Sequence, residues 1–244
     1  MAVLAPVNRP RSYAISASQS PPPTRPVATA VAASKISALV IAWENVLFPA
    51  KWLSDCVGLS ASKKSVEEGK AKSQSNPFLA QALEAIERQA IDLLATASTS
   101  MPVYITTEHP MPVFEAMCSA FFPRLKSCLA TSANRVQVVA TPNASLSSSQ
   151  RSQWKLSVFQ QVCTSAAQRA QSNSGAGGFA RFQVVSISTD ETDLQAASLV
   201  HERLAQYGTV QPVPLQAATS EGKPVSLVDF FHRLSSITST LQRV

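Results

Sequence analysis

Ile36-Ser-Ala-Leu-Val-Ile-Ala-Trp43 is a near-continuous apolar run with the length of a β-strand. Such runs are typical of strands that are buried on both faces of a parallel sheet. Similar runs return at 102–106, 135–140 and 182–187, and each is followed by a segment with apolar residues at helical spacing. This alternation predicts an α/β fold: a three-layer, Rossmann-like parallel sheet with helices on both faces and right-handed crossovers.

Prolines refine this prediction at two places. Residues 210–215 form a fifth candidate strand, which Pro212 and Pro214 would confine to an edge of the sheet. The amphipathic segment 112–129 contains Pro123, which we expect to end or kink that helix.

The chain divides into a tail and one domain. Residues 1–34 are rich in Ala, Ser and Pro, so we expect a disordered tail ahead of a domain over 35–244. The tail lacks acidic residues and carries scattered arginines, so organelle targeting is the alternative to a cytoplasmic location. Inside the domain, we predict a flexible basic loop over 54–75 and a Gly/Ser-rich insertion over 171–178.

Composition excludes several classes of function. The longest apolar stretch is too short to span a bilayer, so we expect no membrane role. The formal net charge is +6, but no aromatic residues interleave with the basic clusters, so we do not expect a nucleic-acid partner. The four cysteines form no CxxC pair and no zinc-like cluster, which favours a reduced, intracellular protein.

Candidate functional residues follow the predicted strands, because parallel sheets bind ligands at the carboxyl ends of their strands. Trp43-Glu-Asn-Val-Leu-Phe-Pro49 follows the first strand, and Thr106-Thr107-Glu108 follows the second. Lys155 lies near the start of the third long predicted helix, and Ser188-Thr-Asp-Glu-Thr-Asp193 follows the fourth strand.

These four segments, in this order, resemble the motifs of the haloacid dehalogenase (HAD) superfamily over about residues 36–205. In one branch of that family the first motif reads Phe-Asp-Trp-Asp-Asp-Thr-Leu-x-Pro-x-x-Trp-Leu. Ile41-Ala-Trp-Glu-Asn-Val-Leu-Phe-Pro-Ala-Lys-Trp-Leu53 keeps both tryptophans and the proline in register. Cys118-Ser-Ala-Phe-Phe-Pro123 also looks like a segment of that branch. The resemblance implies a HAD-like domain with a minimal cap domain or none.

The departures from this pattern fall on the reactive residues. The resemblance assigns one position to each family role: the nucleophile to Ala42, the general acid and base to Glu44, the second-motif threonine to Thr106, the third-motif lysine to Lys155, and the fourth-motif carboxylates to Thr189 and Asp193. Alanine has no nucleophilic atom, and neither Ala42 nor Thr189 offers the carboxylate that magnesium would need. Asp190 is one residue out of register, and we expect it to point away from the site.

Each of these residues also has a purely structural interpretation. Under this interpretation, Trp43 and Trp52 pack in the core, Thr106 and Thr189 cap the helices that follow them, and Lys155 is a solvated helix lysine. The histidines have no carboxylate partner in the sequence, so we expect them at the surface: His109, His201 and His232.

We therefore expect a catalytically inactive HAD-like protein, a pseudoenzyme, that binds a protein partner. Weak phosphate or anion binding through Lys155, Thr106 and the helix after Thr189 is a further expectation. No catalytic residue, cofactor or metal is expected. The alternative is a magnesium-dependent phosphatase that uses Glu44 together with Asp190 or Asp193 in altered roles.

Overall fold

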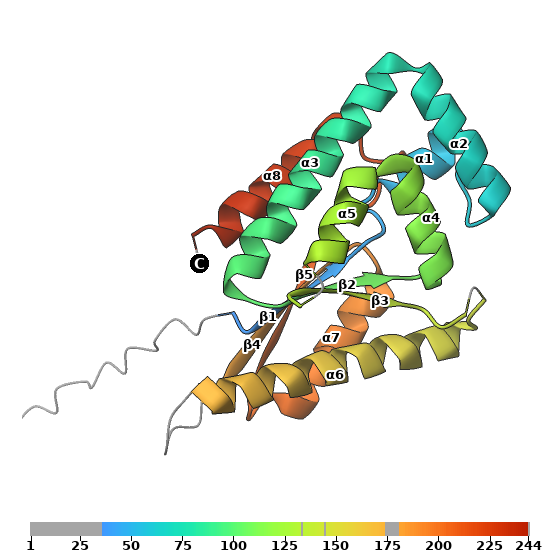
Figure 1. The fold of residues 1–244 in the computed structure, drawn as a ribbon. Coiled ribbons are helices and arrows are strands. Elements are labelled where there is room, and N and C mark those ends of the chain that lie inside the picture. Colours follow the sequence, from blue (N-terminus) through green and yellow to red (C-terminus); the bar gives the residue numbers. More distant parts are fainter. Residues whose placement is uncertain (1–35, 133, 144, 174–180, 244) are drawn as a thin grey trace, which may run out of the picture. The chain divides into compact units, whose positions relative to one another are not determined.

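The structure is a computed structural model that describes residues 36–132, 134–143, 145–173 and 181–243 (Figure 1). The predictions of a disordered tail or a targeting segment over 1–34 lie outside these residues. Most of the predicted insertion at 171–178 lies outside them too; its first residues continue a helix that ends at Asn173.

The described residues contain one five-stranded sheet in which every neighbouring pair of strands is parallel. The strand order is β3-β2-β1-β4-β5, so the first strand of the chain lies in the centre. This arrangement confirms the predicted α/β, Rossmann-like fold. The strands are β1 (Ala38–Ala42), β2 (Val103–Thr107), β3 (Val136–Ala140), β4 (Phe182–Ser188) and β5 (Gly208–Pro214).

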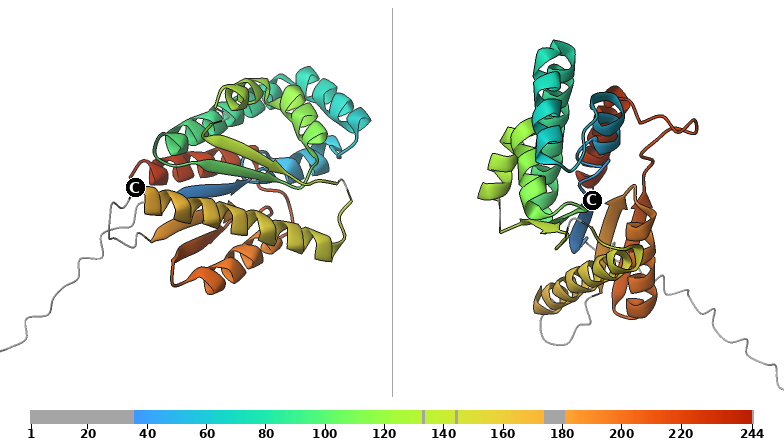
Figure 2. Two further views of the ribbon diagram at one scale, coloured as in Figure 1. Left: turned by 60° about the horizontal axis from the view of Figure 1, so that its bottom comes forward. Right: turned by 90° about the vertical axis from the view of Figure 1, so that its right-hand side faces the viewer.

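Helices cover both faces of the sheet, as the alternation in the sequence predicts. Helices α3, α4, α5 and α8 lie on one face, and α6 and α7 lie on the other (Figures 1 and 2). The helices are α1 (Ala50–Val57), α2 (Lys63–Ser75), α3 (Pro77–Ser100), α4 (Met111–Phe121), α5 (Pro123–Thr131), α6 (Ser148–Asn173), α7 (Glu191–Leu204) and α8 (Leu227–Leu241). Among the described residues, no helix is long and apolar enough to cross a membrane.

Strand β1 shows why the first apolar run decides the fold. Its residues are all buried, and from Ala38 to Ile41 successive side chains enter different cores. Leu39 and Ile41 belong to the core under α3 and α8, whereas Ala38 and Val40 belong to the core under α6 and α7. A strand between two helical layers needs this continuous apolar character.

Prolines limit the strand and the helix at the positions predicted from the sequence. Pro212 and Pro214 lie in β5, the edge strand beside β4. Pro123 separates α4 from α5, so the segment predicted as one helix is two.

The predicted loop over 54–75 is wrong, because this segment forms the second half of α1 and all of α2. The many lysines and serines of this segment are typical of a loop, but its local signals favour a helix. The Ser62 hydroxyl accepts a hydrogen bond from the Ser65 amide, which caps α2. Val66 and Gly69 are buried, and a Cβ atom at Gly69 would lie 3.2 Å from Phe121 Cζ of α4. Tertiary packing of a few small residues thus holds a strongly charged helix.

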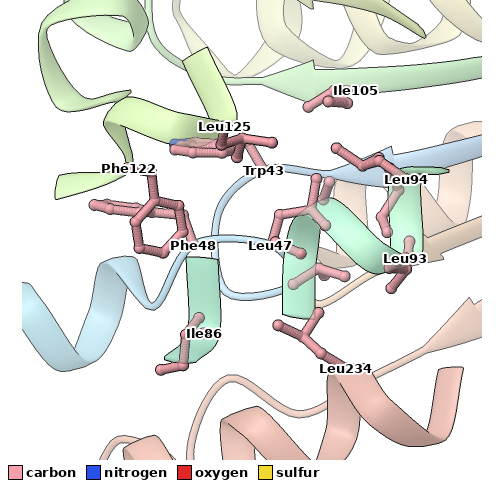
Figure 3. Packing of buried hydrophobic residues seen from close by; sticks show 14 of the residues in the cluster. Trp43, Leu47, Phe48, Ile86, Leu93, Leu94, Ile105, Phe122, Leu125 and Leu234 are labelled. Atoms are coloured by element: carbon pink, nitrogen blue, oxygen red, sulfur yellow. The ribbon is translucent and has the colours of Figure 1, made fainter. Parts of the chain in front are cut away.

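An aromatic cluster fills the core just beyond the carboxyl end of β1 (Figure 3). Trp43 is fully buried, and its ring stacks on Phe48 with a centroid distance of 4.9 Å and an interplanar angle of 6°. Phe122 meets both rings edge-on. The packing interpretation of Trp43 is therefore confirmed, while Trp52 is only partly buried against the same core.

Candidate functional site

The four segments that carry the candidate residues converge at one edge of the sheet. There they surround a cavity of about 230 Å³, beside the boundary between β1 and β4 where the strand order changes direction. Its lining residues are Ala42, Glu44, Asn45, Glu108, Lys155, Thr189, Asp190, Asp193 and Ala217. Five of the six predicted site residues lie here. The exception is Thr106, which is buried in β2 and whose carbonyl oxygen accepts a hydrogen bond from the Trp43 amide.

Glu44 is fixed against the end of β2. One of its carboxylate oxygens, Oε1, accepts hydrogen bonds from Thr107 Oγ1 at 2.6 Å and from the Glu108 amide at 3.1 Å. Asn45 follows with φ of 59°, a left-handed conformation that asparagine tolerates better than most residues. Its side chain also accepts a hydrogen bond from the Lys51 amide. Burial raises the pKa of Glu44 above its ordinary value, although these hydrogen bonds oppose the shift.

Lys155 lies at the centre of the site. Its ammonium nitrogen is 2.7 Å from Asp193 Oδ1, 3.4 Å from Asp190 Oδ2 and 3.5 Å from Glu108 Oε1. The Lys155 side chain is 3% exposed and the Asp193 side chain 2%. Burial opposes the charged form of the lysine, but the three carboxylates outweigh it and hold the pKa of Lys155 above its ordinary value. The interpretation of Lys155 as a solvated helix lysine is therefore wrong.

Asp190 and Glu108 form a pair of interacting carboxyl groups beside Lys155. Burial and hydrogen bonding with Asp190 raise the pKa of Glu108 to about 7. Burial opposes the shift at Asp190, but its hydrogen bond with Glu108 and the charge of Lys155 lower its pKa. The two groups thus hold one proton below neutral pH. The prediction that Asp190 points away from the site is wrong, because the turn after β4 carries it into the cavity wall.

The capping interpretation of the two threonines is also wrong. Asp190 is the N-cap residue of α7, and its side chain accepts a hydrogen bond from the Thr192 amide. Pro110 is the N-cap residue of α4, so Thr106 has no part in that cap. Thr189 instead lines the cavity, one residue before the cap.

His109 lies in this network and not alone at the surface. Its Nε2 is 3.8 Å from Glu44 Oε1, and its backbone amide donates a hydrogen bond to Thr107 Oγ1. Burial lowers the pKa of His109, which favours the neutral imidazole. The expectation that His109 has no carboxylate partner is therefore wrong.

Sequence reasoning did not include Glu108 and Arg151 among the site residues. Arg151 Nε donates a hydrogen bond to Glu108 Oε1 at 3.0 Å, so these residues link α6 to the end of β2. Glu108 had a usable signal, because it directly follows an apolar strand. Arg151 had none, because its partner is 43 residues away in the sequence.

The donor set does not fit the magnesium site that the resemblance to the HAD superfamily implies. A magnesium ion requires several free oxygen ligands in near-octahedral geometry. Asp190 and Asp193 direct one oxygen each at the Lys155 ammonium, and the Ala42 side chain offers none. Among the described residues, no group of three or more His, Cys, Asp or Glu side chains is placed to hold a metal ion.

Comparisons with known proteins give one kind of match. No family model and no curated protein matches the chain. Among solved structures, the chain is similar to the HAD domain of the effector protein Lem4 from Legionella pneumophila, with a TM-score of 0.35 and 6% sequence identity over 85% of this chain and 98% of that one. An inactive mutant of that domain gives a TM-score of 0.36 and 5% identity over 86% and 97% of the two chains. At these TM-scores the likeness carries no argument about family or activity.

Proposed function

We propose that this chain is a catalytically inactive, HAD-like protein that acts as a binding or scaffold module. Most of the residues that carry the resemblance build the core: Trp43, Leu47 and Leu53 are fully buried, and Trp52 packs partly buried against them. At the cavity beside them, the positions that the family uses for the nucleophile and for one magnesium-binding carboxylate hold Ala42 and Thr189. A chain that keeps the framework and lacks the reactive groups supports a role in binding.

The observation that carries this proposal is the environment of Lys155 next to Ala42. The position of the family nucleophile holds a methyl group, and the lysine is paired with three carboxylates. A phosphoryl group entering here would meet the carboxyl groups of Glu44, Asp190 and Asp193, while Lys155, the cation among the described lining residues, is already paired. The proposal therefore includes no phosphate binding at Lys155, and a protein or neutral ligand is the expected partner.

Hydrolysis of a generic aryl phosphate, with and without magnesium, tests the proposal. We expect no turnover above background from the native chain. The double variant Ala42→Asp, Thr189→Asp restores the two carboxylates that the resemblance implies, and a gain of magnesium-dependent turnover would show that the site is correctly placed. Turnover by the native chain that depends on magnesium would refute the proposal.

A magnesium-dependent phosphatase with an atypical site is the second candidate function. It is favoured by one observation: the Glu44 carboxyl faces the cavity, is held in one orientation by Thr107, and has a raised pKa, as a proton-transferring group requires. Under this candidate, Glu44→Gln abolishes turnover, whereas Glu115→Gln on the exposed face of α4 leaves it unchanged. Equal activity in both variants would exclude Glu44 as the acid or base.

A further inference from the structure

A second cavity, of about 320 Å³, lies beside the candidate site and shares Glu108 with it. It is formed by residues at the ends of β2 and β3, by Asn143, Ser145 and Leu146, and by the first turns of α6 and α7. Its volume lies at the lower end of the range for small-molecule pockets, about 300–1,000 Å³, which suits a ligand with a single ring. The lining residues are Glu108, Thr141, Asn143, Ser145, Leu146, Ser148, Arg151, Trp154 and Thr192.

The charges of this second cavity favour a neutral ligand. Arg151 and Glu108 are the charged residues among those that line it, and they are bonded to each other at 3.0 Å. An anionic ligand would have to take Arg151 from Glu108 and leave that carboxyl group next to Asp190. A cationic ligand would have to displace Arg151 in the same way. An uncharged ligand disturbs neither partner.

The hydrogen-bonding groups of the second cavity favour a ligand with many hydroxyl groups. Within the part of the chain that the structure describes, five lining side chains make no hydrogen bond to another protein group through their polar atoms, and the first three are exposed to solvent: Asn143, Ser145, Ser148, Trp154 and Thr192. Together they offer amide and indole N–H donors, a carbonyl acceptor, and hydroxyl groups that do both. A ligand that matches them must itself donate and accept at several points.

Trp154 and Leu146 supply the apolar part of the wall, and Trp154 is the aromatic residue among the described lining residues. It is partly buried, and Lys155 Nζ lies 5.5 Å from the centroid of its ring, so the charged cluster also supports the orientation of the indole. Aromatic rings present a flat apolar surface beside a polar N–H group. A sugar ring combines the same two features, because its C–H groups form an apolar face and its hydroxyl groups project from the rim. We propose that this cavity binds a neutral sugar ring between Trp154 and the hydroxyl and amide side chains.

This inference rests on the proposed binding role and names the class of its ligand, but different experiments would refute the inference and the proposed function. Turnover of an aryl phosphate decides whether the chain is inactive, and sugar binding decides what it holds. The test is saturation-transfer-difference NMR on the full chain with a panel of methyl hexopyranosides and myo-inositol, beside adenosine and glucose 6-phosphate. We expect saturable binding of at least one neutral sugar, and weaker binding of its phosphorylated form.

Variants decide whether binding occurs in this cavity. Trp154→Ala should weaken the affinity for the bound sugar by about tenfold or more, whereas Trp154→Phe, which keeps an aromatic face, should stay within about threefold. Asn143→Ala should weaken it by about threefold or more, and Gln153→Ala, an exposed amide of α6 outside the cavity, should leave it unchanged. Circular dichroism confirms that each variant is folded. No binding by any neutral sugar at tens of millimolar, tighter binding of adenosine or of the phosphorylated sugar, or equal binding by the native chain and Trp154→Ala would each overturn the proposal.

Discussion

Replacing Lys155 by methionine tests the organisation of the candidate site most directly. Methionine keeps the unbranched chain and removes the ammonium group from the centre of three carboxylates. Asp193 would then be a buried carboxylate with no cation within ion-pair distance among the described residues. Its remaining hydrogen bond, from Ser188 Oγ at 2.7 Å, is not enough to offset the loss of solvation.

The magnitude follows from the burial of the pair. Removing one partner of a buried ion pair costs about 3–5 kcal/mol, because the other charge is left without compensation. Domains are stable by about 5–15 kcal/mol, so this loss is a large part of the total. In a domain of this size it corresponds to a decrease in Tm of roughly 6–20 °C. The loss should be larger at pH 8 than at pH 5, because Glu108 carries its full charge only above its raised pKa of about 7.

Urea unfolding followed by circular dichroism measures this effect at both pH values. Lys70→Met is the matched control, because Lys70 is an exposed lysine of α2, and its stability should stay within about 0.5 kcal/mol of the native chain. The double variant Lys155→Met, Asp193→Asn should recover part of the loss, since it removes the uncompensated charge as well. A loss below about 1 kcal/mol for Lys155→Met, or no recovery in the double variant, would refute the view that Lys155 is the essential counter-ion of the site.

Three further predictions concern other parts of the fold. The pKa of Glu108 is raised from 4.5 to about 7, so between these pH values the folded state binds more protons than the unfolded state, and stability falls as the pH rises. Glu108→Gln should reduce this fall in the urea midpoint. An unchanged slope of the midpoint against pH would contradict the assignment. Glu87 is buried, and its Oε1 accepts hydrogen bonds from the Arg124 and Leu125 amides at the start of α5. Glu87→Ala should therefore cost about 2–3 kcal/mol of stability, and Glu87→Gln clearly less. Equal losses in urea unfolding would mean that packing, and not the cap of α5, is responsible. A Cβ atom at Gly208 would lie 2.4 Å from the Phe182 carbonyl oxygen, so Gly208→Ala should lower stability by about 2 kcal/mol or more. A Cβ atom at Gly69 would lie 3.2 Å from Phe121 Cζ and 3.6 Å from Leu59 Cδ1, both side-chain atoms that can shift, so Gly69→Ala should change stability by less than about 1 kcal/mol. The reverse order of melting temperatures would count against this account.

Much of the architecture could be predicted from local sequence. The apolar run that forms β1, the Asn76-Pro77 start of α3 and the break at Pro123 each depend on a few neighbouring residues. The helix α2 could not be predicted in the same way, because it is held by Gly69 against Phe121 of another helix. Such a contact leaves no periodic apolar pattern, so charge and composition pointed to a loop.

The candidate site also has features that local sequence predicts and features that only tertiary contacts decide. The sequence by itself determined which positions follow the strands, and therefore that Ala42 stands where the resemblance implies a nucleophile. Only the tertiary structure decided how the charges there are paired. Lys155 is held by Glu108 from one segment and by Asp190 and Asp193 from another, and Arg151 holds Glu108 in turn. The physical reason is that strand position is a local property of the chain, whereas the balance of buried charges depends on groups that folding brings within 4 Å of one another from distant parts of the sequence.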